Sequence, residues 1–309
     1  MLVLFLRRLA FAVPTILCII AIAFALMHAA PGGPFTRERQ VPPEIEHRLE
    51  VKYGLDLPLP QQFARYVGAL ARGDLGPSMS YKDKSVADII AEGAPTSAIL
   101  GIGAMTLALL IGAGLGVMAA LRQNRPQDYA VMGLAILGVC LPPLVMGPLL
   151  QMQFGIAWPL FPTAGLYHDE FGVRYLVLPI LTLALPYIAI ISRLMRASMI
   201  ETMRSNAIRT ARAKGLPERL VIFRHALPIA LLPVISYVGP ALAGVLAGSF
   251  VVETVFQLPG IGKQFVIAAA QRDYTVVMGV VLVYATMIIA FNLLADMSYR
   301  LLDPRTRTP

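Results

Sequence analysis

The run GAPTSAILGIGAMTLALLIGAGLGVMAAL, residues 93–121, contains 29 residues without a formal charge. An α-helix rises 1.5 Å per residue, so about 20 such residues cross the ~30 Å hydrocarbon core of a bilayer. A soluble domain would need charge to cover a helix of this length. This stretch therefore predicts a membrane-spanning helix and, with it, an integral membrane protein.

The rest of the chain repeats the pattern. Of 309 residues, 57% are hydrophobic and 14% charged, and the mean hydropathy is +0.69. Average soluble domains carry roughly 25% charged residues, so the composition excludes a soluble enzyme, a disordered protein and a disulfide scaffold. Five more apolar stretches can span, at residues 9–30, 129–154, 175–192, 226–252 and 274–295. We expect an all-α integral membrane protein with six transmembrane helices.

This pattern divides the chain into four parts. We expect an uncleaved N-terminal transmembrane helix over 1–30, an external (periplasmic) helical segment over 31–92, a transmembrane domain over 93–299 and a tail over 300–309. Six spans put both termini on one side, which carries 15 basic and 5 acidic residues, a net of +10. The other side nets −2. Because Lys- and Arg-rich loops stay in the cytoplasm, both termini are predicted to be cytoplasmic.

The external segment has its own local signals. Pro42-Pro43 predicts the entry to a short helix whose apolar and acidic positions are Glu44, Ile45, Leu49 and Tyr53. A second helix is expected over 63–70, ended by 73–77. Ser85 and Asp88 have the spacing of a capping box. The segment is either a small cap packed over the bundle or a docking surface for a soluble partner.

The loop between the fourth and fifth spans reads SMIETMRSNAIRTARAKGLPERLVIFRHALP, residues 198–228. Ser205 or Asn206 can cap a short basic helix, Gly215 supplies a left-handed stop, and Pro217 opens a second helix. Small alanines on one side of the first helix permit insertion into a groove on a partner. Anionic lipid headgroups could hold the same loop, and composition does not separate the two interpretations.

This loop resembles the coupling loop of permeases from binding-protein-dependent ABC importers. The family pattern is Glu-Ala-Ala, three residues, Gly, nine residues, then Ile-x-Leu-Pro. The spacing is kept around Gly215, with Arg209 in place of Glu and His225 in place of Ile. RTARAKGL, residues 209–216, is similar to the peptide and nickel branch, and PFTRER (34–39) and SYKDKSV (80–86) resemble B-type oligopeptide permeases most. Other matching segments are YGLDLPLPQQ (53–62), VVETVFQLPGIG (251–262), RDYTVVMG (272–279) and LLDPR (301–305).

The resemblance implies a type I ABC importer transmembrane domain in the bacterial inner membrane. It implies a second permease subunit, two cytoplasmic ATPase subunits that bind ATP and Mg, an external substrate-binding protein and an oligopeptide substrate. The implied ATPase-coupling residues are Ala207, Ile208, Arg209, Thr210, Ala211, Arg212, Ala213, Lys214, Gly215 and Leu216. This chain would then form half of the translocation pathway.

The chain itself lacks the patterns of catalytic chemistry. GIGK, residues 260–263, lacks the earlier glycine of a phosphate loop, the four histidines are scattered, and no nucleophile elbow is present. We therefore expect a non-catalytic subunit without a cofactor or metal. Polar residues inside the spans are candidates for the translocation path or a gate, although each could instead bond a neighbouring helix. They are Gln151, Ser236, Tyr237, Ser249, Glu253 and Asn292.

Other functions stay open at this point. A dipeptide, nickel or glutathione importer of the same family would use the same architecture. An ion-coupled secondary transporter would need buried charged relays and broken helices near the bilayer midplane, whereas the charges here stay near the ends of the spans. An intramembrane enzyme is disfavoured because no catalytic pair can be assembled.

Overall fold

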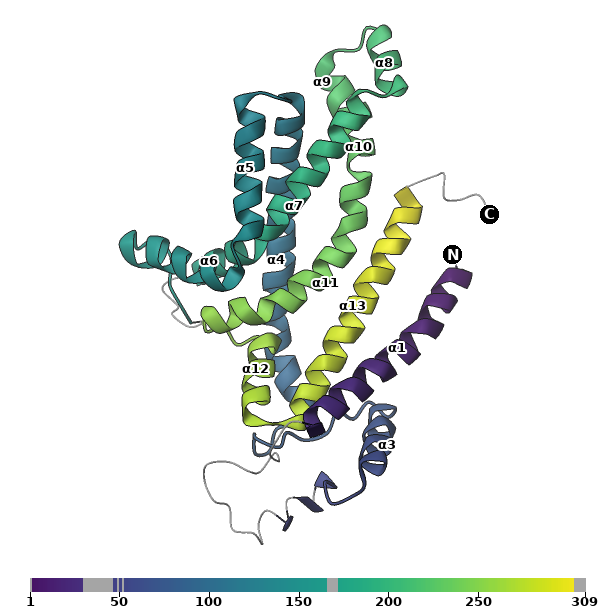
Figure 1. Cartoon of the computed structure of the whole chain (residues 1–309), viewed down its shortest axis with the longest axis vertical. Helices are drawn as coiled ribbons and strands as arrows, with labels where there is room; N and C mark the ends of the chain where they lie inside the picture. Colours follow the sequence, from purple (N-terminus) through teal and green to yellow (C-terminus); the bar gives the residue numbers. More distant parts are fainter. Residues whose placement is uncertain (1, 30–46, 49, 52, 166–171, 303–309) are drawn as a thin grey trace. The chain divides into compact units, whose positions relative to one another are not determined.

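The computed structural model describes residues 2–29, 47–48, 50–51, 53–165 and 172–302. Within these ranges every regular element is helical (Figure 1), apart from an isolated bridge between Pro77 and Ser85. The all-α prediction is therefore confirmed. The elements are α1 (Leu2–Ala29), α3 (Leu59–Leu70), α4 (Val86–Leu121), α5 (Pro126–Cys140), α6 (Pro143–Leu150), η1 (Gln151–Ala157), η2 (Gly172–Leu176), α7 (Val177–Met203), α8 (Asn206–Ala213), α9 (Glu218–Leu220), η3 (Val221–Ala226), α10 (Leu227–Ala230), α11 (Leu232–Val255), α12 (Ile261–Gln271) and α13 (Tyr274–Leu302).

The described helices account for six candidate membrane spans. Four are long and apolar enough individually: Ala10–Ala29, Val86–Leu121, Val173–Met203 and Tyr274–Ala295. Two more arise when bent pairs are each counted as one span, namely Glu218–Ala230 with Leu232–Leu246 and Pro126–Cys140 with Pro143–Ala157. The predicted number of spans is confirmed on this count.

The third predicted span, 129–154, is not one continuous helix. The chain bends by 106° between α5 and α6. Leu141 is extended, with φ −91° and ψ 112°, because a residue that precedes proline avoids the helical region. Pro142 and Pro143 lack the backbone N–H groups that would continue the helix. The predicted span is therefore formed by two helices with a sharp bend between them, and the proline pair is the physical reason.

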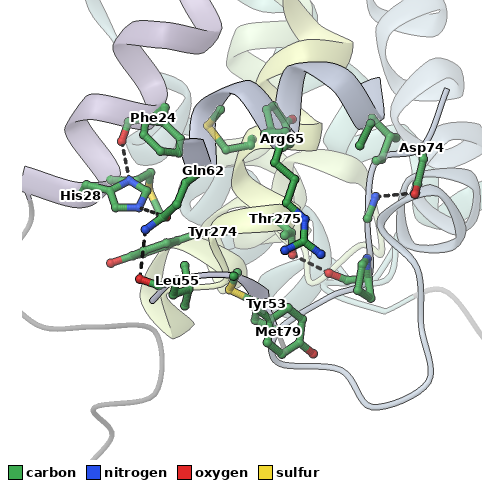
Figure 2. Close-up of a pocket in the computed structure, with 18 residues that line it drawn as sticks. Phe24, His28, Tyr53, Leu55, Gln62, Arg65, Asp74, Met79, Tyr274 and Thr275 are labelled. Atoms are coloured by element: carbon green, nitrogen blue, oxygen red, sulfur yellow. Dashed lines mark hydrogen bonds between the residues drawn. The ribbon is translucent and has the colours of Figure 1, made fainter. Parts of the chain in front are cut away.

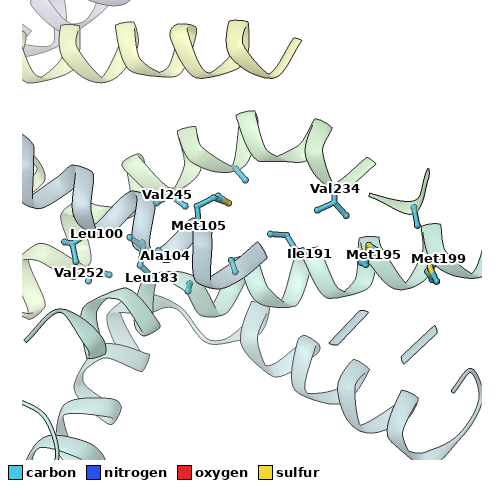
Figure 3. Close-up of a cluster of buried hydrophobic side chains, with 14 of the residues drawn as sticks. Leu100, Ala104, Met105, Leu183, Ile191, Met195, Met199, Val234, Val245 and Val252 are labelled. Atoms are coloured by element: carbon cyan, nitrogen blue, oxygen red, sulfur yellow. The ribbon is translucent and has the colours of Figure 1, made fainter. Parts of the chain in front are cut away.

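The chain forms two compact units. Unit 1 contains residues 97–258 and 288–302, and unit 2 contains the described residues of 2–96 together with 259–287. The core of unit 1 lies where α4, α7 and α11 pack together, and Figure 3 shows side chains such as Ala104, Met105, Leu183 and Val245 meeting there. These units are not the four parts predicted from the sequence, whose boundaries stay a prediction.

Close packing in unit 1 depends on two glycines of α4. A Cβ on Gly112 would lie 2.9 Å from the Ile188 carbonyl oxygen, and one on Gly116 would lie 2.6 Å from Met195 Cβ. Gly114, between them, faces open space. The two contact glycines are four residues apart and so share one helix face, which lets α4 approach the α7 backbone.

Unit 2 contains α1, α3, α12 and the first turns of α4 and α13. Its core consists of Val86, Ile89, Ile261, Ala268, Val276, Val277 and Val280. The predicted capping box is confirmed, since the Asp88 amide donates to Ser85 Oγ at 3.1 Å and the Ser85 amide donates to Asp88 Oδ2 at 3.1 Å. The helix predicted over 63–70 is confirmed as part of α3. In the helix expected after Pro43, the positions Glu44, Ile45 and Leu49 lie outside the described residues.

Candidate functional site

The predicted basic helix of the 198–228 loop is α8. Ser205 occupies the N-cap position with extended backbone, φ −68° and ψ 156°. Gly215 has φ +74°, the left-handed conformation that glycine adopts without a Cβ penalty. Pro217 then precedes α9. The helix, its glycine stop and the proline-led second helix therefore match the prediction.

The expected side-chain cap is absent. Ser205 makes no side-chain capping bond, and its hydroxyl oxygen is buried without a hydrogen-bond partner in the described part of the chain. The cap position was therefore predicted correctly, but the bond expected from Ser205 or Asn206 was wrong. The first turn instead has the 3.2 Å bond from the Arg209 amide to the Ser205 carbonyl.

The two faces of α8 have different environments. Ile208 is fully buried and Ala211 is 6% exposed, and both belong to the core cluster of unit 1. The opposite face is solvent-exposed and contains Ala207, Arg209, Thr210 and Ala213. Ile208 and Ala211 therefore anchor the helix to its own unit. The small and basic residues on the other face are available to a partner.

An ion pair closes the turn around Gly215. Arg212 donates to Glu218 through Nη2 at 2.5 Å and through Nε at 3.1 Å. This hydrogen bonding, with the negative charge of Glu218, raises the pKa of the Arg212 guanidinium. Both side chains are about half exposed, so the pair contributes at most about 1 kcal/mol. It links the last turn of α8 to the first residue of α9.

An exposed surface of apolar and basic residues lies next to the Gly215 turn. Pro217, Arg219, Leu220 and Phe223 line a shallow hollow, and Phe223 is 59% exposed. Arg209, Lys214 and Arg224 in the same loop are also exposed. Aromatic and arginine side chains are enriched at protein-binding surfaces. In Figure 1, α8 and α9 lie at the same end of unit 1 as the α4–α5 connection. The Arg204 guanidinium, just before α8, donates a 3.2 Å hydrogen bond to the side-chain oxygen of Gln123 in that connection.

The proposed path residues mostly bond their own surroundings. Gln151 donates to the carbonyls of Thr163 at 2.6 Å and Val255 at 3.3 Å. Ser236 and Ser249 donate to carbonyls of their own helix, at 2.9 Å each. These bonds satisfy the polar groups within one unit. Gln151, Ser236 and Ser249 therefore do not form a polar channel within this chain alone.

The other three path candidates lie in different environments. Glu253 is fully buried, and Ser97 donates a 2.7 Å hydrogen bond to its Oε1. Tyr237 is half-buried and packs against the core of unit 1, and Asn292 is half-buried in α13. A buried carboxylate inside an apolar bundle is costly, so Glu253 is the most constrained of the six.

Sequence reasoning missed a buried ion pair between α5 and α7. Asp128 is 1% exposed and accepts from Arg196 Nε at 2.5 Å and Nη2 at 2.7 Å. The Asn124 amide adds a third bond at 2.9 Å. The partners are 68 residues apart, and no local spacing signals such a pair.

Comparisons with known proteins agree with this architecture. Residues 112–308 match the family described as binding-protein-dependent transport system inner membrane component. The chain is 48% identical to the oligopeptide transport system permease protein OppB of Salmonella typhimurium, over 98% of each chain, and equally to OppB of Escherichia coli strain K12. It is 43% identical to the dipeptide transport system permease protein DppB of Bacillus subtilis, over 95% of this chain and 94% of that one.

A solved structure shares the fold. The crystal structure of an amino acid ABC transporter with histidines matches with a TM-score of 0.55 and 17% identity, covering 70% of this chain and 94% of that one. In the described residues no three His, Cys, Asp or Glu side chains are grouped to hold a metal ion. On its family match and its full-length relatives, the chain belongs to the inner membrane components of binding-protein-dependent transport systems.

Proposed function

We propose that this chain is a permease subunit of an ATP-driven importer of oligopeptides. The proposal of an oligopeptide substrate is supported by the 48% identity to oligopeptide permeases over 98% of the chain. The identity to a dipeptide permease is lower, at 43%. Because both coverages are nearly complete, the difference reflects the whole sequence rather than one motif.

The assembly we propose contains a second permease, two ATPase subunits and an external binding protein. ATP and Mg bind on the ATPases, and this chain is non-catalytic with both termini in the cytoplasm. The exposed face of α8 and the surface around Phe223 contact one ATPase. Ile208 and Ala211 transmit its movement because they are buried in unit 1, so α8 cannot move without moving the helices it packs on.

Uptake by the reconstituted transporter tests the substrate class. Proteoliposomes that hold all subunits should accumulate a labelled tetrapeptide or pentapeptide when ATP and the binding protein are supplied. Excess unlabelled oligopeptide should compete, whereas nickel chelate and glutathione should not. Dipeptide that competes better than oligopeptide would move the assignment to the dipeptide relatives.

Ion coupling predicts the opposite energy dependence. Uptake that persists without ATP while an ion gradient is held would contradict the proposal and favour a secondary transporter. Uptake that follows ATP hydrolysis, and that collapses when the ATPase subunits are inactivated, would support it.

A further inference from the structure

Unit 2 contains a cavity of about 220 Å³ that the proposed transport function does not use. The end of α1, helix α3, the stretch 74–79 and the start of α13 surround it (Figure 2). Cavities near 150 Å³ hold a molecule the size of benzene, and drug-sized sites begin at roughly 300 Å³. The volume therefore suits a single amino-acid residue rather than an extended peptide or a full lipid chain.

One wall of the cavity is fixed by hydrogen bonds between α1 and α3. The His28 ring nitrogens lie 2.9 Å from the Phe24 carbonyl oxygen and 3.2 Å from Gln62 Oε1. Gln62 Nε2 then donates to the carbonyls of Leu55 and Leu57 at 3.0 and 2.8 Å. These contacts link the end of α1 to α3 and to the backbone at Leu55 and Leu57, which shapes this wall.

The opposite wall is fixed through Asp273, which precedes α13. Its Oδ2 accepts from the amides of Met79 at 3.1 Å and Ser80 at 3.0 Å, and its Oδ1 accepts from the Val276 amide at 3.1 Å. Asp273 is 1% exposed. Tyr53 closes this side by donating to the Ser78 carbonyl at 3.1 Å.

Arg65 supplies a positive charge at the cavity. Its side chain is exposed, and it makes no ion pair within the described residues. Gly54, at φ +70°, lets the guanidinium approach, because a Cβ there would lie 2.5 Å from Arg65 Nη1. Figure 2 shows the Arg65 side chain extending from α3 towards the side of Tyr53 and Thr275.

The remaining lining is aromatic and apolar. Phe24, Met27, Tyr274 and Met278 contribute rings and thioethers. Burial raises the pKa of the Tyr66 phenol to about 12. The nearby Asp74 carboxylate already accepts from the Gly76 amide at 2.9 Å. A ligand therefore meets the Arg65 guanidinium, the Asp74 carboxylate and a largely apolar surface.

We propose that this cavity binds the carboxy-terminal residue of a peptide that carries an aromatic or large aliphatic side chain. The terminal carboxylate pairs with the Arg65 guanidinium, whose planar fork matches a carboxylate, and the side chain packs among the rings. This inference rests on the proposed peptide transport for its ligand class. It gives the permease a preference among peptides that is separate from the choice made by the binding protein.

Binding of two matched probes to the full chain, assembled with its partner subunits in lipid nanodiscs, tests the inference. The probes are N-acetyl-L-phenylalanine and N-acetyl-L-phenylalaninamide, which differ at the carboxylate alone. We expect the acid to bind about tenfold or more tightly than the amide, because the amide lacks the charge-assisted hydrogen bonds to the guanidinium. Arg65→Gln should remove that difference and leave amide binding unchanged.

Two more variants separate charge from folding. Gly54→Ala keeps the Arg65 charge but displaces the guanidinium, so it should also weaken binding of the acid. Arg72→Gln removes an exposed arginine that does not line the cavity and should leave both affinities unchanged. Equal binding of acid and amide by the unaltered protein, or acid binding unaffected by Arg65→Gln, would overturn the inference. Displacement of the acid by decanoate at equal concentration would also overturn it, in favour of a fatty-acid site.

Peptide uptake by the same preparations distinguishes the two proposals. If the unaltered protein imports peptides but does not discriminate acid from amide, the cavity assignment fails and the proposed function stands. If it imports no peptide, the proposed function fails whatever the probes show.

Discussion

At the residue scale, Gly215 is the position where a single side chain has the clearest consequence. Its φ is +74°, and a Cβ there would meet nothing within 4 Å. A substitution therefore acts through backbone strain alone, which costs about 1–2 kcal/mol for a residue in the left-handed region. We expect Gly215→Val to lower transport-coupled ATP hydrolysis several-fold in the reconstituted complex while the chain still folds.

Gly165 provides a matched control for that experiment. It has φ +88° and equally open surroundings, but it lies outside the 198–228 loop. Gly165→Val should impose a similar strain without loss of coupling. Wild-type coupling in Gly215→Val, or equal loss in both variants, would contradict a specific role for the turn.

The Asp128–Arg196 pair makes a second prediction at this scale. Removing one partner of a buried ion pair costs about 3–5 kcal/mol, and the lower end applies because the Arg196 side chain keeps 25% exposure. Arg196→Met should therefore lower the unfolding temperature in detergent clearly. The double variant Asp128→Leu, Arg196→Met should recover much of the loss, since no unpaired charge is left.

The exposed Arg212–Glu218 pair is the comparison for stability. Both partners are about half exposed, so Glu218→Gln should change the free energy of unfolding by less than about 1 kcal/mol. An equally large loss from Glu218→Gln and Arg196→Met would show that burial does not govern these pairs.

At the element scale, the approach of α4 to α7 depends on which glycines face the contact. A Cβ on Gly116 would lie 2.6 Å from both Met195 Cβ and the Ser192 carbonyl oxygen. Gly116→Ala should therefore separate the helices and destabilise the chain by about 1–3 kcal/mol. Gly114→Ala meets open space and should be neutral or stabilising, since alanine favours a helix over glycine by about 0.5–1 kcal/mol.

Thermal unfolding of the two variants in the same detergent checks this prediction. Equal melting temperatures would indicate that α4 and α7 are not in close contact. The sequence shows three closely spaced glycines at 112, 114 and 116, but it cannot tell which of them face α7, because that depends on the rotation of α4 about its axis.

Element boundaries were predictable where local chemistry sets them. The Ser85–Asp88 capping box and the Gly215 stop are formed by residues within a few positions of each other, so their spacing is visible in the sequence. The bend after Cys140 was missed although Pro142 and Pro143 are its cause. Prolines also occur inside continuous helices here, at Pro95 in α4 and Pro186 in α7, so proline alone does not determine whether a span breaks.

At the scale of the whole molecule, the charge distribution predicts which loops face the cytoplasm. Cys18 and Cys140 would first be replaced by alanine. Single cysteines at the exposed positions Arg72 and Arg122 would then be treated with a membrane-impermeant maleimide on intact cells with an opened outer membrane. Because basic loops are retained inside, we expect labelling at position 72, and at position 122 only after the inner membrane is permeabilised.

Loss of function in the cysteine-free background is controlled by measuring peptide uptake before labelling. Labelling at 122 but not at 72 in intact cells would reverse the predicted orientation. In the described chain, α4 is the one candidate span between positions 72 and 122, so these positions should lie on opposite sides of the membrane. Labelling of both positions in intact cells would contradict that arrangement.

The sequence by itself determined the helical class, the six apolar spans, the charge asymmetry and the short basic helix before Gly215. These features depend on side-chain polarity, helical period and backbone preferences, which act between neighbours along the chain. The tertiary structure decided the Asp128–Arg196 pair and the bonds by which Asp273 holds the backbone at Met79 and Ser80, more than 190 residues earlier. It also decided which face of α8 is buried and the cavity beside Arg65. Each of these depends on groups that come together only when distant helices pack, and no spacing along the chain encodes that distance.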